Sequence, residues 1–238
     1  MKKAIVVGAS SGIGYQLAVL LAQNGYKVGI TGRRDQLLLN LQATNLQQFV
    51  VSVFDVTDIA AVSQQLKQLT DELGGLDLLV LSSGTGKINP ELDTKIEQDI
   101  NALNVAGFSA VADWAFNFFQ KQAFGQFAAI TSIAGIRGSR QAPAYFASKA
   151  YQINYLEGLR QKAKKTKLPI YITDIRPGFV DTAMAAGENL FWVASVEKAA
   201  KQIYTAIENR RDVVYITKRW RIVGFLFWIL PKSIHKRL

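Results

Sequence analysis

Short apolar runs alternate with longer amphipathic segments along most of this chain of 238 residues. A run of four to six apolar, β-branched residues is typical of a strand that is buried on both faces. Such runs lie at residues 4–7, 27–31, 49–54, 77–81, 126–131, 170–175 and 213–216. Apolar residues at helical spacing predict helices at residues 13–24, 36–43, 58–73, 93–122, 145–165 and 196–209. Strands that alternate with helices form βαβ units, so we expect an α/β domain with a doubly wound parallel sheet of about seven strands and helices on both faces.

The regular pattern ends near residue 217. We therefore expect residues 1–217 to form one domain and residues 218–238 to form a tail of different composition. No segment reaches the roughly 18 consecutive apolar residues of a membrane-spanning helix. The apolar run at the N-terminus ends at Gly8, too early for the core of a signal peptide. A cytoplasmic location is the resulting expectation.

The composition excludes several kinds of site. Cysteine is absent and His235 is the only histidine, so we expect no metal site and no catalytic triad that includes histidine. Acid–base chemistry then rests on Tyr, Lys, Asp, Glu or Ser. The net charge of +10 permits nucleic acid, a membrane surface or an anionic ligand as partner. This charge is concentrated near the end of the chain, where eight Lys or Arg and a single acid, Asp212, follow residue 209.

A glycine-rich turn joins the first predicted strand to the first helix. Its spacing is G-x-x-x-G-x-G, and the residues expected to face a ligand are Gly8, Ser10, Ser11, Gly12, Ile13 and Gly14. The glycines let the backbone turn tightly and let a pyrophosphate approach the N-terminus of the helix. The position directly after a strand indicates a Rossmann-type dinucleotide site, whereas the alternative is an ordinary strand–helix turn.

The end of the second predicted strand indicates which dinucleotide is bound. A site for NAD usually has an acidic residue here, which bonds to the ribose 2′-hydroxyl. This chain has Gly32 followed by Arg33 and Arg34. Guanidinium groups suit a 2′-phosphate in both charge and bidentate geometry, so the residues favour NADP. The alternative is a solvated basic loop.

A tyrosine, a lysine and a serine form the candidate acid–base group. Tyr145 and Lys149 are four residues apart in a predicted helix, so they lie on one helix face. A nearby ammonium lowers the pKa of a tyrosine, which otherwise lies near 10. Ser132 follows the fifth predicted strand, where a hydroxyl can hold a substrate oxygen beside Tyr145. The structural alternatives are a helix-surface pair and a serine that forms a turn.

Together these motifs resemble the short-chain dehydrogenase/reductase family over residues 3–184, and more weakly to residue 216. The tetrad that this resemblance implies consists of Asn104, Ser132, Tyr145 and Lys149. It also implies cofactor contacts at Asp55, Val56, Ser83, Gly84, Pro177, Gly178, Val180 and Thr182, besides the glycine turn, the two arginines, Tyr145 and Lys149. One departure from the family pattern is Leu81-Ser82-Ser83-Gly84, where most members have Asn-Asn-Ala-Gly.

The resemblance implies reversible hydride transfer between NADP(H) and a carbonyl or alcohol. Tyr145 would donate the proton during reduction, and Lys149 would lower the tyrosine pKa and hold the ribose hydroxyls. Ser132 would orient the substrate oxygen, and Asn104 would hold a water that continues a proton relay from Lys149. Thr182 would contact the carboxamide of the cofactor.

The segment after Thr182 corresponds to the substrate lid of the family. Its apolar residues are Met184, Leu190, Phe191 and Trp192. They favour an apolar or lipid-linked substrate, and the alternative is that they pack the lid against the domain.

The tail contains an apolar segment, residues 222–230, with cations on both sides. Aromatic residues and flanking cations are typical of a helix that lies in the membrane interface. We therefore expect peripheral association with the inner face of a membrane. Burial in a homo-oligomer interface, which is also expected for this chain, and packing against its own domain are the alternatives.

The sequence thus predicts an NADP-dependent oxidoreductase. The main alternative is a non-catalytic sensor or scaffold protein that binds NADP with the same fold, for which the altered Leu81–Gly84 segment is the supporting feature. Nucleic acid is not the expected partner, because the cations flank a continuous apolar stretch rather than form a groove for phosphates.

Overall fold

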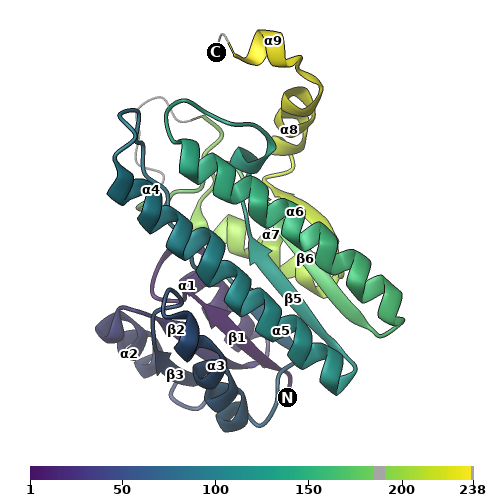
Figure 1. Ribbon diagram of the computed structural model, residues 1–238. Helices are drawn as coiled ribbons and strands as arrows, with labels where there is room; N and C mark the ends of the chain where they lie inside the picture. Colours follow the sequence, from purple (N-terminus) through teal and green to yellow (C-terminus); the bar gives the residue numbers. More distant parts are fainter. Residues whose placement is uncertain (185–190, 237–238) are drawn as a thin grey trace.

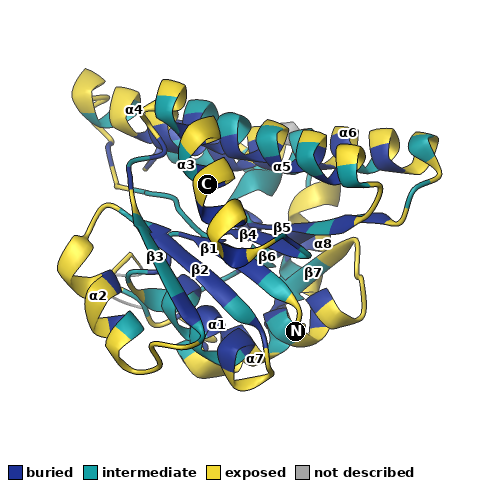
Figure 2. Cartoon of the chain, turned by 90° about the horizontal axis from the view of Figure 1, so that it is seen from below, coloured by how far each residue is buried: buried dark blue, intermediate teal, exposed yellow. Residues whose placement is uncertain are grey.

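The computed structural model describes residues 1–184 and 191–236 and has three layers (Figure 1). A sheet lies between helices α3, α4, α5 and α6 on one face and α1, α2 and α7 on the other (Figure 2). The strands are β1 (Lys3–Val7), β2 (Lys27–Gly32), β3 (Phe49–Val53), β4 (Leu78–Leu81), β5 (Gly125–Ile130), β6 (Ile170–Pro177) and β7 (Val213–Ile216). The helices on its faces are α1 (Gly12–Gln23), α2 (Asp35–Ala43), α3 (Ile59–Leu73), α4 (Thr94–Asn101), α5 (Phe108–Gln122), α6 (Pro143–Thr166) and α7 (Val196–Glu208).

The sheet confirms the predicted Rossmann-type, doubly wound fold. Its seven strands are parallel in the order β3-β2-β1-β4-β5-β6-β7. The order reverses at β1, where Val7 pairs with Thr31 on one side and Leu81 on the other. Connections therefore leave in opposite directions at this point, and the crevice between them is where such sheets bind ligands.

Each strand is apolar on both faces because each face is covered by helices. Ala4 and Val6 belong to the core under α1 and α7, whereas Ile5 and Val7 belong to the core under α3 and α5. Successive side chains of a strand point to opposite faces, so a short run supplies both cores. This explains why the strands read as continuous apolar runs rather than alternating ones.

The long helix expected over residues 93–122 is interrupted. A π-helix, η1 (Ala102–Gly107), separates α4 from α5. Asn104 lies in this turn and is completely buried. A wider turn changes the direction of backbone groups, and such turns are frequent at functional sites. The pattern of apolar residues does not reveal the interruption, because the flanking helices continue in nearly the same direction (Figure 1).

Three further short elements lie toward the carboxyl ends of the strands or beyond them (Figure 1). They are the 3₁₀ helix η2 (Ile133–Ile136) and the tail helices α8 (Trp220–Ile229) and α9 (Lys232–His235). Trp220 is buried, and Gly224 lies against Ile136 and Tyr215, where a Cβ would come within 2.9 Å and 3.0 Å. The first turns of the tail therefore pack onto the domain, while its remainder extends beyond it (Figure 1). No helix in the two described ranges has the length and apolar character needed to cross a bilayer.

Candidate active site

The glycine turn connects β1 to α1 at the point where the strand order reverses. Gly8 has a φ of +91°, and a Cβ there would lie 2.6 Å from the backbone nitrogen of Ser83. A Cβ on Gly14 would lie 2.1 Å from the carbonyl oxygen of Gly8. These two glycines are therefore required by the turn itself. Ile13 is partly buried and packs against the core under α1.

Gly12 and Ser11 form the N-terminal rim of helix α1. Gly12 has a φ of +58°, and a Cβ there would lie 3.3 Å from Cγ2 of Thr182. Thr182, expected as a cofactor contact, therefore stands directly over the turn. The first backbone N–H groups of α1 face this space, and they favour a negatively charged group.

Arg34 lies against the same turn. Its guanidinium donates to the Ser10 hydroxyl from Nε at 3.1 Å and from Nη2 at 2.7 Å. Nη2 also donates to the Ser11 hydroxyl at 2.6 Å. One cation and two hydroxyls thus lie together at the end of β2, where a ribose of a dinucleotide would be.

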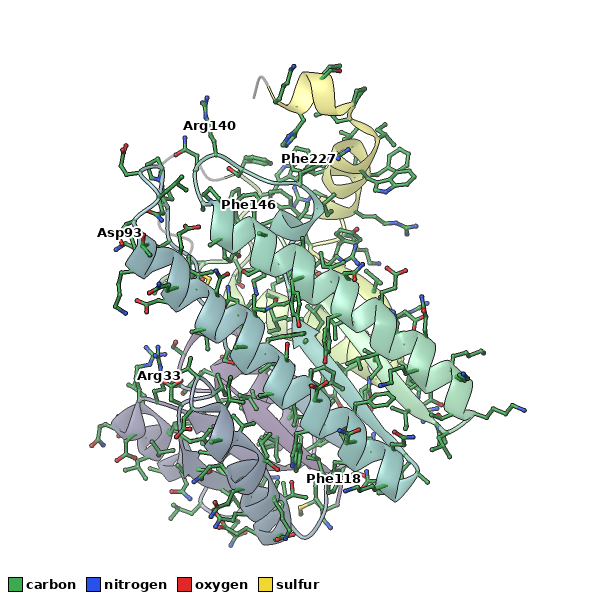
Figure 3. All side chains as sticks on the ribbon, viewed as in Figure 1. Arg33, Asp93, Phe118, Arg140, Phe146 and Phe227 are labelled. Atoms are coloured by element: carbon green, nitrogen blue, oxygen red, sulfur yellow. The ribbon has the colours of Figure 1, made fainter. Side chains whose placement is uncertain are left out.

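Arg33 turns toward the end of β3 and is largely exposed (Figure 3). Its Nη1 lies 3.3 Å from Oδ2 of Asp55, whose Oδ1 accepts a bond of 2.9 Å from the backbone of Thr57. Burial acts to raise the pKa of Asp55, but the bonds from Thr57 and the charge of Arg33 outweigh it and leave the pKa lowered. Val56 is buried behind it, with its carbonyl oxygen against Gly107 of η1.

The three predicted acid–base residues come from two elements. Tyr145 lies in the first turn of α6 and Lys149 in the next turn, with its Nζ 6.0 Å from the centre of the tyrosine ring. Ser132 directly precedes η2 after β5, and its hydroxyl donates to the Pro177 carbonyl oxygen at 3.5 Å and accepts from the Ala134 backbone at 3.1 Å. It is also near enough to Tyr145 to affect the tyrosine pKa. The structure therefore places Ser132 beside Tyr145, with the lysine one turn further along α6.

Burial has a strong effect on the two titratable groups. It raises the pKa of Tyr145, and the Ser132 side chain acts against this rise only in part. It lowers the pKa of Lys149 to about 8, with the charge of Asp174 acting in the opposite direction. The expectation that Lys149 lowers the pKa of Tyr145 is thus not met, because loss of solvent dominates at both groups. The phenol is therefore protonated at neutral pH.

Both polar atoms of the Asn104 side-chain amide form hydrogen bonds. Its Oδ1 accepts from the backbone of Thr85 at 2.9 Å, and its Nδ2 donates to Thr85 O at 2.7 Å and to the Ser148 hydroxyl at 3.0 Å. Its backbone oxygen accepts a bond of 2.8 Å from Nε2 of Gln152, whose Oε1 accepts one of 2.9 Å from Lys149 Nζ. Asn104 and Lys149 are thus connected through Gln152, where the sequence led us to expect a water.

The altered segment after β4 remains well connected to the sheet. The backbone nitrogens of Ser82 and Ser83 both donate to the carbonyl oxygen of Val7, at 2.8 Å and 2.9 Å. A Cβ on Gly84 would lie 3.5 Å from both Asn104 Oδ1 and Lys149 Nζ. The floor of the site is therefore formed by backbone and small side chains, despite the departure from the family pattern.

The segment after β6 lies opposite the glycine turn. Pro177 ends the strand, and the backbone of Gly178 donates to Ile216 at 2.8 Å. A Cβ on Gly178 would lie 2.0 Å from the Trp220 ring, so glycine is required there. Val180 is buried and forms an isolated bridge with Ala194. The fold thus packs Trp220 of the tail against residues 177–182, the segment expected to close over a nicotinamide.

Aromatic residues form a cluster on this lid. The rings of Phe179, Phe191, Trp192 and Trp220 contact one another at centroid distances of 5.2 to 5.9 Å. Phe191 and Trp192 nevertheless keep 52% and 41% of their surface exposed, and Met184 keeps 51%. Leu190, also expected to face the substrate, lies outside the described residues. The cluster packs the lid and leaves apolar surface beside the site.

A pocket of about 280 Å³ lies between η2 and α6. Its lining includes Gly135, Ile136, Phe146 and Ala147, which are chain neighbours of the acid–base residues. Figure 3 shows Phe146 at the same end of the molecule as Phe227 of α8. Arg137 and Ser139 also line it, whereas Ser132, Tyr145 and Lys149 do not. Pro143, Phe146, Ala147 and Ala150 share a face of α6 that differs from the face of Tyr145 and Lys149, so this pocket is separate from the candidate catalytic group.

Sequence reasoning missed two polar residues of this site. Gln152 and Ser148 are both buried and bond to tetrad members. Both occur at helical spacing from Tyr145, on the face that carries Lys149, and a buried polar residue on that face was the available signal. Their shared partner Asn104 lies more than forty residues away in the chain, so the bonds to it are not predictable from local pattern.

Comparisons with known proteins agree with this geometry. The sequence profile of the short chain dehydrogenase family matches residues 2–191. An uncharacterized oxidoreductase of Staphylococcus aureus (strain USA300) is 33% identical over 192 residues, which cover 79% of this chain and 82% of that protein. A relative with the same description in Myxococcus xanthus (strain DK1622) is 34% identical over 196 residues, covering 79% and 76%.

Solved structures share the fold. An alcohol dehydrogenase of the archaeon Thermococcus sibiricus, complexed with 5-hydroxy-NADP, superposes with a TM-score of 0.81 at 19% identity, covering 90% of this chain and 95% of that one. ElxO with NADP bound gives a TM-score of 0.81 at 22% identity, covering 90% and 96%. The profile match, the two relatives and the ordered tetrad on a doubly wound sheet together show that this chain belongs to the short-chain dehydrogenase/reductase family of oxidoreductases.

Proposed function

We propose that this protein transfers a hydride between NADP(H) and a carbonyl or alcohol. The observation that carries the proposal is the position of Ser132 beside Tyr145, with the buried ammonium of Lys149 6.0 Å from the centre of the tyrosine ring. The nicotinamide of NADP(H), when bound, supplies or accepts the hydride. Ser132 holds the substrate oxygen, and Tyr145 donates a proton to it during reduction. Burial keeps Tyr145 protonated at neutral pH, which is the form that reduction requires.

The residues present fit NADP. The glycine turn leaves the N-terminus of α1 open to a pyrophosphate, since Gly12 meets only the Thr182 side chain. Arg34, Ser10 and Ser11 supply one cation and two hydroxyls at the position for a 2′-phosphate. Two solved structures of this fold carry NADP or 5-hydroxy-NADP. The chain has no acid there to bond to a 2′-hydroxyl, which disfavours NAD.

Titration with NADPH and NADH tests the cofactor assignment. Energy transfer from tryptophan to bound nicotinamide reports binding, and the chain contains 4 tryptophans. We expect NADPH to bind at least tenfold more tightly than NADH. Equal affinities would contradict the role of the two arginines, and absence of binding by both would favour a non-catalytic protein.

Tyr145→Phe tests catalysis. The variant keeps the ring against Gly86 but lacks the proton donor. We expect loss of NADPH-dependent reduction of an aldehyde such as decanal, with NADPH affinity within twofold of wild type. Turnover within threefold of wild type would overturn the assignment of Tyr145.

The substrate that we propose is apolar. The support comes from the lid, where Met184, Phe191 and Trp192 keep 51%, 52% and 41% of their surface exposed. A series of aldehydes of increasing chain length tests this, because each buried methylene contributes about 0.8 kcal/mol. We expect kcat/KM to rise several-fold per added carbon pair until the chain extends beyond the lid. A flat or falling series would contradict the proposal.

We further propose that helix α8 binds the surface of an anionic membrane and that the protein is a cytoplasmic enzyme at its inner face. Exposed apolar side chains cover the helix, namely Ile222, Phe225, Leu226, Phe227, Trp228 and Ile229, each at least 36% exposed. No Asp or Glu follows Asp212, and Lys218, Arg219 and Arg221 are exposed at the base of the helix. An exposed apolar surface with cations at its base complements anionic lipid.

The domain holds α8 in this exposed position. Arg137 donates to the carbonyl oxygens of Phe227, Trp228 and Leu230 at 2.6 Å, 2.8 Å and 2.7 Å. These bonds satisfy the C-terminal end of the helix, which otherwise needs water. Helix α8 lies at the end of the molecule toward which the strands of the sheet point (Figure 1).

Sedimentation with vesicles tests the membrane proposal. We expect binding to vesicles of phosphatidylcholine with phosphatidylglycerol, weaker binding to phosphatidylcholine alone, and at least tenfold loss with Trp228→Ser. Leu46→Ser is the matched control, because Leu46 is 72% exposed and lies between α2 and β3. A Trp228-dependent dimer in light scattering without vesicle binding would instead assign the surface to a homo-oligomer.

A non-catalytic NADP-binding protein remains the second candidate, favoured by the Ser82-Ser83 segment. Yet the bonds of Ser82 and Ser83 to Val7 preserve the strand geometry, and the polar groups around Asn104 are retained. NADPH binding without turnover of any carbonyl in the series would select this candidate.

A further inference from the structure

Gln152 lies one turn after Lys149 in α6 and is 1% exposed. A side-chain amide buried to this degree must satisfy its donors and acceptor within the protein. Its Oε1 accepts from Lys149 Nζ at 2.9 Å, and its Nε2 donates to the backbone oxygen of Asn104 at 2.8 Å. The amide therefore joins two members of the tetrad.

Few groups hold the Lys149 ammonium. Within residues 1–184 and 191–236 it bonds to Gln152 and to the carbonyl oxygen of Ile130, at 2.9 Å and 3.2 Å. The charge of Asp174 favours the ammonium from further away, while burial opposes it. Gln152 thus provides the shorter of the two bonds to a cation that its surroundings tend to neutralise. A bond to the charged form of a group favours that form.

The fold also positions the backbone oxygen of Asn104, which accepts the hydrogen bond from Gln152. Asn104 lies in the π-helix η1, whose turn differs from that of the adjoining helices. Its backbone oxygen points to Gln152, and its side chain is engaged with Thr85 and Ser148. The Gln152 amide consequently has fixed partners on both sides and one orientation that satisfies them, with oxygen toward lysine and nitrogen toward the carbonyl.

We propose that Gln152 is a positioning residue that clamps the Lys149 ammonium to the Asn104 backbone, in the place that a water would occupy in the relay implied by the family resemblance. This inference rests on the proposed function of the tetrad. A water can exchange its donor and acceptor roles, whereas an amide keeps its nitrogen as donor and its oxygen as acceptor. Gln152 therefore maintains the charge and position of Lys149 and carries no proton itself.

Two substitutions separate this role from simple packing. Gln152→Met fills the space but removes the acceptor and the donor. Gln152→Ala leaves room for a water that bonds to both Lys149 and the Asn104 carbonyl. If Gln152 only fills space, Gln152→Met should perturb Lys149 less than Gln152→Ala does, because Ala leaves a cavity. If Gln152 positions Lys149, Gln152→Met should change the pKa of Lys149 more than Gln152→Ala does.

The first readout does not require turnover. The free energy of unfolding in urea is measured as a function of pH for each Gln152 variant and for the same variant that also carries Lys149→Met. The pH dependence of the difference between the two free energies gives the pKa of Lys149. We expect Gln152→Met to lower this pKa by about one unit relative to wild type. Gln152→Ala is expected to stay within half a unit. Gln126→Met is the control, because its amide also donates to a backbone carbonyl, that of Ile207 at 2.8 Å.

The second readout is the pH profile of kcat for decanal reduction by NADPH. We expect its alkaline limb to move to lower pH in Gln152→Met by the same amount, with KM for NADPH changed less than kcat. Gln152→Glu retains an acceptor for Lys149 and adds a negative charge, so it should move the pKa upward. This variant decides the question if Gln152→Met does not fold, since packing alone predicts no upward shift.

The two proposals fail in different ways. Lack of turnover by wild type would refute the proposed function and leave the clamp to be judged by the unfolding measurements alone. A pKa of Lys149 that is unchanged in both Gln152→Met and Gln152→Glu, or an effect of Ala larger than that of Met, would overturn the role of Gln152.

Discussion

Replacing Lys149 by methionine should change how stability depends on pH. Lys149 is 4% exposed, and burial lowers its pKa from 10.5 to about 8. The unfolded chain therefore binds more protons than the folded one between these values, so the wild-type free energy of unfolding rises with pH across this window. Each unit of difference in pKa corresponds to about 1.4 kcal/mol, so burial of the charge costs about 3 kcal/mol below pH 8.

Most of this effect is accessible to experiment. From pH 7.0 to 9.5 wild type should gain about 2 kcal/mol relative to Lys149→Met, as measured by urea unfolding with circular dichroism. At a single pH the comparison also contains the lost bonds to Gln152 and Ile130, so the change with pH is the diagnostic quantity. Lys165→Met removes an exposed charge from the same helix and serves as control.

Parallel pH profiles for wild type and Lys149→Met would refute the reasoning. They would show that the folded site solvates the ammonium as well as water does. The expected result would instead show that the fold keeps a destabilising cation in place, as enzymes do where a charge is needed for function.

Four further substitutions test the rest of the site. Ser132→Ala should lower kcat for decanal about 100-fold with NADPH affinity unchanged, and a loss under threefold would contradict its role. Arg34→Ala should weaken NADPH binding about tenfold and leave NADH binding as it is, measured by the same energy-transfer titration. Gly8→Ala should destabilise the fold by about 2 kcal/mol, because φ is +91° there, and a urea midpoint equal to wild type would contradict this. Trp220→Ala should cost at least about 3 kcal/mol in urea unfolding, since the ring is buried against Gly178, and a cost under 1 kcal/mol, about the effect of a surface change, would show that the tail is not part of the core.

The elements with strong local patterns were predictable. The expected strand at residues 213–216 coincides with β7, and the expected helix at residues 58–73 differs from α3 by one residue, because Asp58 caps its N-terminus. Such patterns arise because each strand must be apolar on both faces and each helix on one. Interruption of the helix at residues 93–122 was missed, since a π-helix depends on what Asn104 bonds to rather than on apolar spacing.

The features of the candidate active site also divide into those set by neighbouring residues in the chain and those set by distant ones. The sequence by itself determined that Tyr145 and Lys149 share a helix face and that a glycine turn follows β1, because both depend on residues close together in the chain. Tertiary structure decided that Arg34 rests on Ser10, that Gln152 reaches the Asn104 carbonyl, and that burial rather than Lys149 dominates the pKa of Tyr145. Bonds and desolvation of this kind depend on groups that are distant in the chain, and only folding brings them together.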